Sequence, residues 1–101
     1  MEPAIWTKQD WEERLLEFDA ADSLATGDSV SSIVGITVWE GTTDKSATML
    51  SGAPSLVGNK AYAKIIGGVD GHSYWVRIRL LTAAGDKIED DLRLLIRNVG
   101  G

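Results

Sequence analysis

The 101-residue sequence contains no cysteine and one histidine. Without cysteine there is no disulfide framework and no cysteine-based zinc site, which fits a reducing environment or a fold that needs no covalent cross-link. The single imidazole, His72, lies in a glycine-rich corner, where we expect an exposed loop histidine rather than a general base. No serine lies in a Gly-x-Ser-x-Gly pattern. We therefore expect no enzymatic activity and no catalytic residue.

Long apolar runs and clusters of basic residues are also missing. No run approaches the roughly 18 apolar residues that a membrane-spanning helix requires, and the first residues do not combine a basic region with an apolar stretch, as a secretory signal does. The formal net charge is −5, whereas nucleic-acid binding depends on clustered Lys and Arg. We therefore expect a soluble protein with neither a membrane nor a nucleic-acid partner.

Acidic and glycine-rich segments offer no clear ligand site. Glu89, Asp90 and Asp91 are neighbours on an expected strand, where alternate side chains point to opposite faces, and Asp19 with Asp22 lacks the spacing of a calcium loop. No Lys-Ser or Lys-Thr pair and no helix follows the glycines of residues 67–71, so we expect a turn there and not a phosphate loop. The sequence thus predicts no metal and no cofactor.

The C-terminal half carries the clearest structural pattern. In residues 74–81 every second side chain is apolar, and the side chains between them are Trp75, Arg77 and Arg79. Residues 86–99 alternate in a similar way, and Gly85 suits the turn between the two segments. These segments predict a β-hairpin. A helix over residues 86–99 is the alternative, because Leu92, Leu95 and Ile96 also share a helical face.

Further strands are expected at residues 28–39 and 60–66, with a bulge where Ser32 and Ile33 fall out of phase. In the second of these strands Ala61, Ala63 and Ile65 point inward and Tyr62 outward. Residues 40–59 are rich in Gly, Ser and Thr, which indicates short strands joined by turns.

The N-terminal segment can be read in two ways. The spacing of Trp11, Leu15 and Phe18 fits a helical stripe, but residues 13–19 also fit a strand that ends at Asp19. We prefer the strand, because the other elements are strands. Residues 1–12 are expected to be loosely ordered, with one domain over residues 13–101.

Strands of this number and spacing favour an all-β fold, an antiparallel immunoglobulin-like β-sandwich of about seven strands. Asp70, Gly71 and Tyr74 support it locally. In such sandwiches a tyrosine near the start of the penultimate strand packs inward and bonds back to the preceding corner. We expect Tyr74 to take that position, with Asp70 and Gly71 forming the corner.

Four tryptophans in 101 residues are the most informative anomaly. Trp75 lies beside Arg77 and Arg79 on the outward side of its strand, and Trp and Arg are enriched at binding hot spots. Another segment of the chain could instead cover Trp75. We select Trp75, Arg77, Arg79 and Tyr62 as a candidate contact surface. A sugar-binding platform is the other use of exposed Trp, and it needs a second ring, such as Trp39 or Tyr62, near Trp75.

Taken in order, the turn and core residues resemble a known group of proteins. The matching segments are Phe18-Asp19, Leu24-Ala25-x-Gly27-Asp28-Ser29-Val30-Ser31-Ser32, Gly67-Gly68-x-x-Gly71-x-x-Tyr74-x-Val76 and Thr82-x-x-Gly85. They are similar to small phage and prophage proteins with an immunoglobulin-like β-sandwich. The chain departs from that pattern at residues 8–12, where a Pro-Gly turn is usual, and it lacks the Trp often found before the glycine pair.

The resemblance implies a virion-associated structural or interaction module without enzymatic activity, such as a head decoration, head-tail or tail accessory protein. Its expected partners are other virion or phage assembly proteins, and its expected location is the virion or the host cytoplasm. The alternative is a carbohydrate-binding or adhesion domain of a bacterial protein.

Overall fold

The alternating C-terminal segments form the longest antiparallel pair of the computed structural model, which describes residues 4–98. Strand β7 (Ser73–Thr82) runs beside β8 (Lys87–Ile96), with Tyr74 opposite Leu94 and Val76 opposite Leu92. The hairpin is therefore confirmed, and the helical alternative for residues 86–99 is wrong over the described part of that segment. Side chains at every second position of β7 from Tyr74 to Thr82 are buried, and so are Leu92, Leu94 and Ile96 in the second half of β8, as a two-residue period requires.

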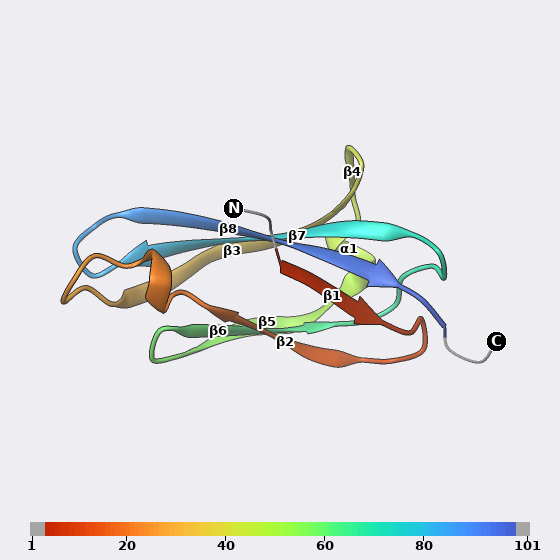
Figure 1. Ribbon diagram of the computed structural model, residues 1–101, viewed down its shortest axis with the longest axis horizontal. Coiled ribbons are helices and arrows are strands. Elements are labelled where there is room, and N and C mark those ends of the chain that lie inside the picture. Colours follow the sequence, from red (N-terminus) through yellow and green to blue (C-terminus); the bar gives the residue numbers. More distant parts are fainter. Residues whose placement is uncertain (1–3, 99–101) are drawn as a thin grey trace.

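This hairpin belongs to the larger of two stacked sheets (Figure 1). The five-stranded sheet has the order β1-β8-β7-β3-β4, and the three-stranded sheet has the order β2-β6-β5. The remaining strands are β1 (Ala4–Lys8), β2 (Arg14–Asp19), β3 (Val30–Glu40), β4 (Thr43–Asp44), β5 (Leu50–Val57) and β6 (Lys60–Ile65). A short 3-10 helix, η1 (Ala21–Ser23), and one helical turn, α1 (Ser46–Met49), lie in the connections.

The core fills the space between the two layers. It is one cluster to which both sheets contribute, and its most deeply buried members include Val38 on β3, Ile65 on β6, Ile78 on β7 and Leu94 on β8. The all-β sandwich is thus confirmed. Its immunoglobulin-like subclass stays a prediction, which the order of β3, β7 and β8 in one sheet and of β2, β6 and β5 in the other supports.

Several upstream expectations are confirmed as well. Residues 14–19 are extended and pair with β6, so the helical reading of this segment is wrong. Ala61, Ala63 and Ile65 point inward. Two register shifts in β3, near Ser32 and between Ile33 and Gly35, confirm an irregular strand. Residues 40–59 contain β4 and β5, together with α1, which the sequence did not predict.

The N-terminal segment differs from the expectation. Residues 4–8 are not loosely ordered, because they form β1, which pairs in parallel with β8 from Ala4 opposite Leu92 to Lys8 opposite Ile96. The described residues thus form eight strands instead of about seven, and the five-stranded sheet is mixed and not wholly antiparallel. The short strand gave little periodic signal, since its inward residues are the amphipathic Trp6 and the charged Lys8. The expected loose order of residues 1–3 falls outside the described residues.

Candidate functional site

The outer face of the five-stranded sheet brings together most of the residues selected from the sequence. We use "outer face" for the outward-pointing positions of β3, β7 and β8. On β7 these are Trp75, Arg77 and Arg79. Each stands between a residue of β3 and a residue of β8, which gives three rows: Trp39-Trp75-Arg93, Thr37-Arg77-Asp91 and Gly35-Arg79-Glu89. Neighbours within a row are close enough to interact across the strands.

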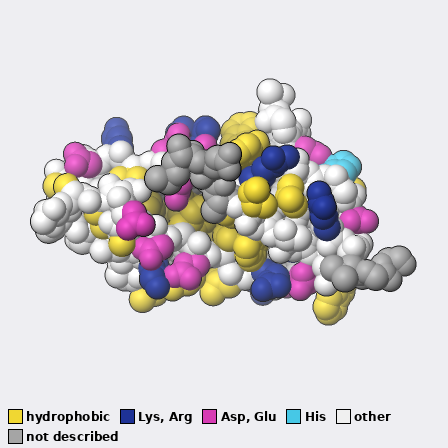
Figure 2. Space-filling model, viewed as in Figure 1, with side chains coloured by type: hydrophobic (Ala, Val, Ile, Leu, Met, Phe, Trp, Pro, Cys, Tyr) yellow, Lys and Arg dark blue, Asp and Glu magenta, His cyan; other side chains and the backbone are white. Residues whose placement is uncertain are grey.

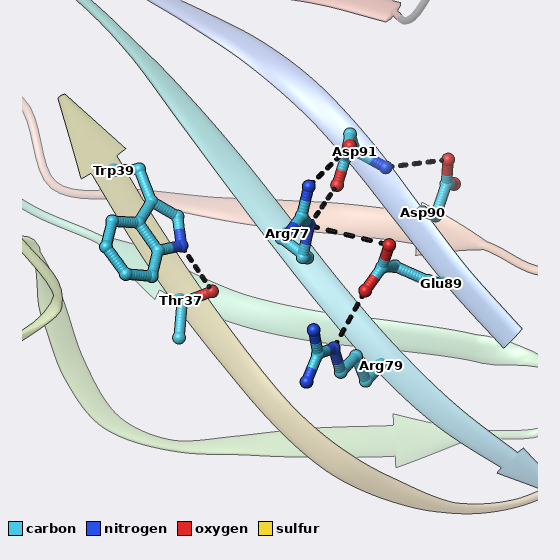
Figure 3. Close-up of polar contacts among 7 residues, drawn as sticks. All are labelled: Thr37, Trp39, Arg77, Arg79, Glu89, Asp90 and Asp91. Atoms are coloured by element: carbon cyan, nitrogen blue, oxygen red, sulfur yellow. Dashed lines mark hydrogen bonds and ion pairs between the residues drawn. The ribbon is translucent and has the colours of Figure 1, made fainter. Parts of the chain in front are cut away.

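Ion pairs connect β7 and β8 on this face (Figure 3). Arg77 donates from Nε to Asp91 Oδ1 at 2.9 Å and from Nη2 to Asp91 Oδ2 at 3.4 Å. Glu89 accepts from Arg79 Nε at 2.8 Å and also lies 3.7 Å from Arg77 Nε. The hydrogen bond from Arg77 to Asp91, with the charges of Asp91 and Glu89, raises the pKa of Arg77 above its ordinary value. The two guanidinium groups are therefore held in fixed orientations on an accessible surface.

The aromatic end of the outer face is hollow. Trp39 and Trp75 are cross-strand partners, and Trp39 Nε1 donates to Thr37 Oγ1 at 3.1 Å. Both rings line a shallow depression of about 420 Å³, together with Gly41, Thr42, Arg77 and Asp91. Trp75 remains 41 % exposed. The chain therefore leaves much of this ring open to solvent.

The hollowing continues along the sheet past the ion pairs. One depression of about 200 Å³ is lined by Val34 and Gly35 together with Arg77 and Arg79, among others. Another of about 340 Å³ lies between Val34, Arg79 and Ile88. Val34 is exposed because it sits at the bulge between Ile33 and Gly35. The outer face is thus a shallow trough with apolar ends and a charged middle.

Tyr62 does not belong to this surface. It points outward from β6 in the three-stranded sheet, where Lys64 lies on the same side of the strand. The sandwich core therefore separates Tyr62 from Trp75. Strand parity alone could not reveal this, because it does not say which sheet a strand joins.

The corner residues lie at one end of the sandwich. Tyr74 is buried, and its hydroxyl oxygen accepts a hydrogen bond from the backbone N–H of Val69 at 3.0 Å. Gly71 N–H donates to the Ile96 carbonyl at 2.8 Å, and Asp70 Oδ1 accepts from Asn98 N–H at 2.9 Å. These contacts hold the connection between β6 and β7 against the end of β8.

His72 lies half-exposed at the same end, with its Nδ1 beside Glu40 Oε2 and its ring 6.4 Å from that of Tyr74. Among residues 4–98, no group of three His, Cys, Asp or Glu side chains is placed to hold a metal ion. Neither helix in this part of the chain is long and apolar enough to cross a membrane.

Sequence reasoning missed several neighbours of the selected residues. Asp91 and Glu89 had been weighed as metal ligands, whereas they pair with Arg77 and Arg79. The alternating charged residues of β7 and β8 indicated that ion pairs could form between the strands. Which residues pair could be assigned only once the register of the hairpin was known. The burial of Lys8 and the exposure of Trp11 were also missed.

Comparison with known proteins identifies a family. Curated proteins give no match. A family model described as Gp77, podophage GP4 fiber-tail adaptor protein gp77, matches residues 8–96. This range runs from the last residue of β1 to the last residue of β8, so it includes β2 to β8 and the outer face. The chain therefore belongs to the family of the podophage GP4 fiber-tail adaptor protein gp77, a family of phage structural proteins.

Proposed function

We propose that the chain is a non-enzymatic accessory protein of a phage tail, which joins other virion proteins and uses its outer face as a docking surface. The observation that carries this proposal is the match to a fiber-tail adaptor family over residues 8–96. An adaptor has to present at least one surface that recognises a neighbour. The outer face fits that requirement, because it combines Trp and Arg side chains in a shallow trough.

The ion pairs of the outer face support docking by reducing its cost. Arg77 and Arg79 are already oriented by Asp91 and Glu89, so they lose less side-chain freedom when a partner covers them. The outward positions of β7 and β8 carry four basic residues, Arg77, Arg79, Lys87 and Arg93, against the two acidic residues Glu89 and Asp91. This basic excess on a chain of net charge −5 favours an acidic partner surface.

The β4 side of the five-stranded sheet and the β5 edge of the three-stranded sheet are poorer docking elements than this face. A partner strand can add to an exposed edge only where the edge is long and regular. On the outer-face side, β4 is two residues long and β3 has two register shifts. In the other sheet, β5 has a register shift between Ser51 and Ser55. At these two edges, side-chain docking on the face is therefore favoured over strand addition.

The test uses tail particles from the encoding phage or prophage with this gene deleted, to which purified chain is added back. Trp75→Ala and Arg79→Ala are expected to weaken incorporation by roughly tenfold or more. Lys60→Ala is the matched control, because Lys60 is an exposed, ion-paired base on the other sheet. Equal incorporation of all variants would refute the outer face as the docking surface.

A glycan site is the second candidate, because the structure brings a second ring beside Trp75. Trp39 and Trp75 line one depression with Arg77 and Asp91, so stacking surfaces and hydrogen-bonding groups lie together. Titration with soluble glycans, followed by tryptophan fluorescence, separates the two candidates. A saturable shift that Trp75→Ala abolishes would favour the glycan site.

A further inference from the structure

A second surface feature lies away from the outer face. Trp11, in the loop between β1 and β2, has 89 % of its surface exposed. Residues 9–13 are called the Trp11 loop below. This loop lies at the same end of the molecule as the C-terminus of β8 (Figure 1). Figure 2 shows apolar surface that protrudes at this end, at the lower right. Single exposed apolar residues are common, so the exposure alone assigns no role.

The backbone of the Trp11 loop is held by a buried lysine. Lys8 is 1 % exposed, and its Nζ donates to the carbonyl oxygens of Gly67 at 2.6 Å and Gln9 at 2.7 Å. Moving an ammonium group out of water is costly, and this burial lowers the pKa of Lys8 below its ordinary value. The hydrogen bonds offset the cost, and they fix the start of the loop against the connection between β6 and β7.

Further contacts fix the loop on both sides of Trp11. Gln9 N–H donates to Glu12 Oε1 at 2.7 Å, and Glu12 N–H donates to the Gln9 carbonyl at 3.2 Å. Asp10 N–H donates to Asn98 Oδ1 at 3.0 Å, which ties the loop to the end of β8. An exposed indole is therefore presented from a backbone that is tied at several points. Such a group loses little conformational freedom when it binds.

We propose that the Trp11 loop is an anchor that inserts the indole of Trp11 into an apolar pocket, rimmed by basic side chains, on another virion protein. This inference rests on the proposed function, because it takes the partner to be a component of the same particle. A large amphipathic ring on a rigid support has the properties of a binding hot spot.

The charges around Trp11 predict which charge the rim of the partner's pocket carries. Trp11 is flanked by Asp10, Glu12 and Glu13. Glu12 Oε2 lies 3.3 Å from Arg14 Nη1, and Glu13 Oε1 lies 3.4 Å from Lys64 Nζ. Asp10 and Glu13 are both exposed. These acidic flanks match Lys and Arg on a protein partner. An anionic lipid surface repels such acidic flanks, because it attracts basic segments.

The experiment measures binding of the purified full chain to tail particles that lack this protein. Trp11→Ala is expected to weaken binding by roughly tenfold or more, with the thermal midpoint unchanged because the ring contributes little to the fold. Trp11→Phe is expected to retain part of the affinity. Val57→Ala is the matched control, because Val57 is 64 % exposed at the turn between β5 and β6, at the opposite end of the sandwich.

The other outcomes separate this inference from the proposed function. If Trp11→Ala binds as tightly as the wild-type chain while Trp75→Ala binds more weakly, the anchor is overturned and the proposed docking face remains in place. Failure of the wild-type chain to bind the particles overturns both. Self-association in sedimentation that Trp11→Ala abolishes identifies a second copy as the occupant and overturns the assignment to a different virion protein. Binding to anionic phospholipid vesicles that depends on Trp11 also overturns it.

Discussion

Gly68 lies in a connection between the two sheets, where backbone conformation and packing both restrict which residue can be accommodated. It lies between β6 and β7 with φ of +94°, and a Cβ atom there would lie 2.7 Å from Ile96 Cγ1. Both the backbone strain and the overlap with a core side chain act against any larger residue. Gly41 has a φ of +59° but open space around the same position. A comparison of substitutions at the two glycines therefore distinguishes the effect of backbone strain from the effect of packing.

We predict that Gly68→Ala lowers the free energy of unfolding by about 2–4 kcal/mol, as the sum of strain and overpacking. Gly41→Ala is expected to cost about 1 kcal/mol, from strain alone. Urea denaturation of both variants measures the difference. Equal losses would show that Ile96 moves aside without cost.

Asp28 carries a pH-dependent contact between two turns. Its Oδ1 accepts hydrogen bonds from Ser29 N–H at 2.8 Å and from Ala84 N–H at 3.1 Å, which joins the start of β3 to the turn between β7 and β8. The bond from Ser29, helped by the Thr82 side chain and by the bond from Ala84, holds the pKa of Asp28 below its ordinary value of 3.8. Because folding lowers this pKa, the stabilisation is fully present above pH 3.8 and is lost as the pH falls through the folded value.

We predict that Asp28→Asn lowers stability at neutral pH and flattens the acid side of the stability profile. Urea midpoints measured from pH 7 down to roughly pH 2 give that profile. Asp22→Asn, in the exposed η1 turn, changes the net charge equally and serves as the control. An unchanged acid limb in Asp28→Asn would show that other carboxylates carry the pH dependence.

At the scale of elements, the alternation of β8 determines which side chains reach the core. Leu94 is fully buried opposite Tyr74, whereas the next residue, Leu95, points outward and is only partly covered. Both are leucines on the same strand, so they differ mainly in parity. The same parity places Asp91 and Glu89 beside the arginines of β7.

We predict that Leu94→Ala lowers the free energy of unfolding by about 2–5 kcal/mol through lost burial and a cavity. Leu95→Ala is expected to cost about 1 kcal/mol or less. Chemical denaturation of the two variants tests the assignment. A larger loss for Leu95→Ala would mean that the register of β8 is shifted by one residue.

The elements that could be predicted from sequence are those whose periodic pattern continues over many residues. Residues 74–81 carry enough alternating positions to indicate a strand without any tertiary information. Strand β1 has five residues, and its inward Lys8 breaks the apolar pattern. The helical turn α1 spans four residues, too few for a helical stripe. Short elements such as these are stabilised by their neighbours, so local sequence does not reveal them.

At the scale of the whole molecule, a single core joins both sheets. Leu16 and Phe18 of β2 pack in the same cluster as Val76 and Ile78 of β7, and Trp6 of β1 packs against it. Neither sheet can keep its inner face dry without the other. The first strand is part of this cooperative unit, since it both pairs with β8 and contacts the core.

We predict that the chain unfolds in one cooperative transition. Far-ultraviolet circular dichroism reports both sheets. The change in tryptophan fluorescence reports β1, β3 and β7 through Trp6, Trp39 and Trp75, because Trp11 is already exposed in the folded chain. The two midpoints are expected to coincide, as two-state unfolding requires. A separate, earlier fluorescence transition would indicate that part of the five-stranded sheet melts on its own.

The sequence by itself determined the class of the fold, because alternation along a strand is a local property that decides which side chains turn away from water. It also determined that Trp75, Arg77 and Arg79 share one side of their strand. Only the tertiary structure decided that Trp39 stands beside Trp75, that Tyr62 lies on the other sheet, and that Lys8 is buried while Trp11 is exposed. These placements depend on which strands become neighbours and in which register, and that choice follows from burying both inner faces at once.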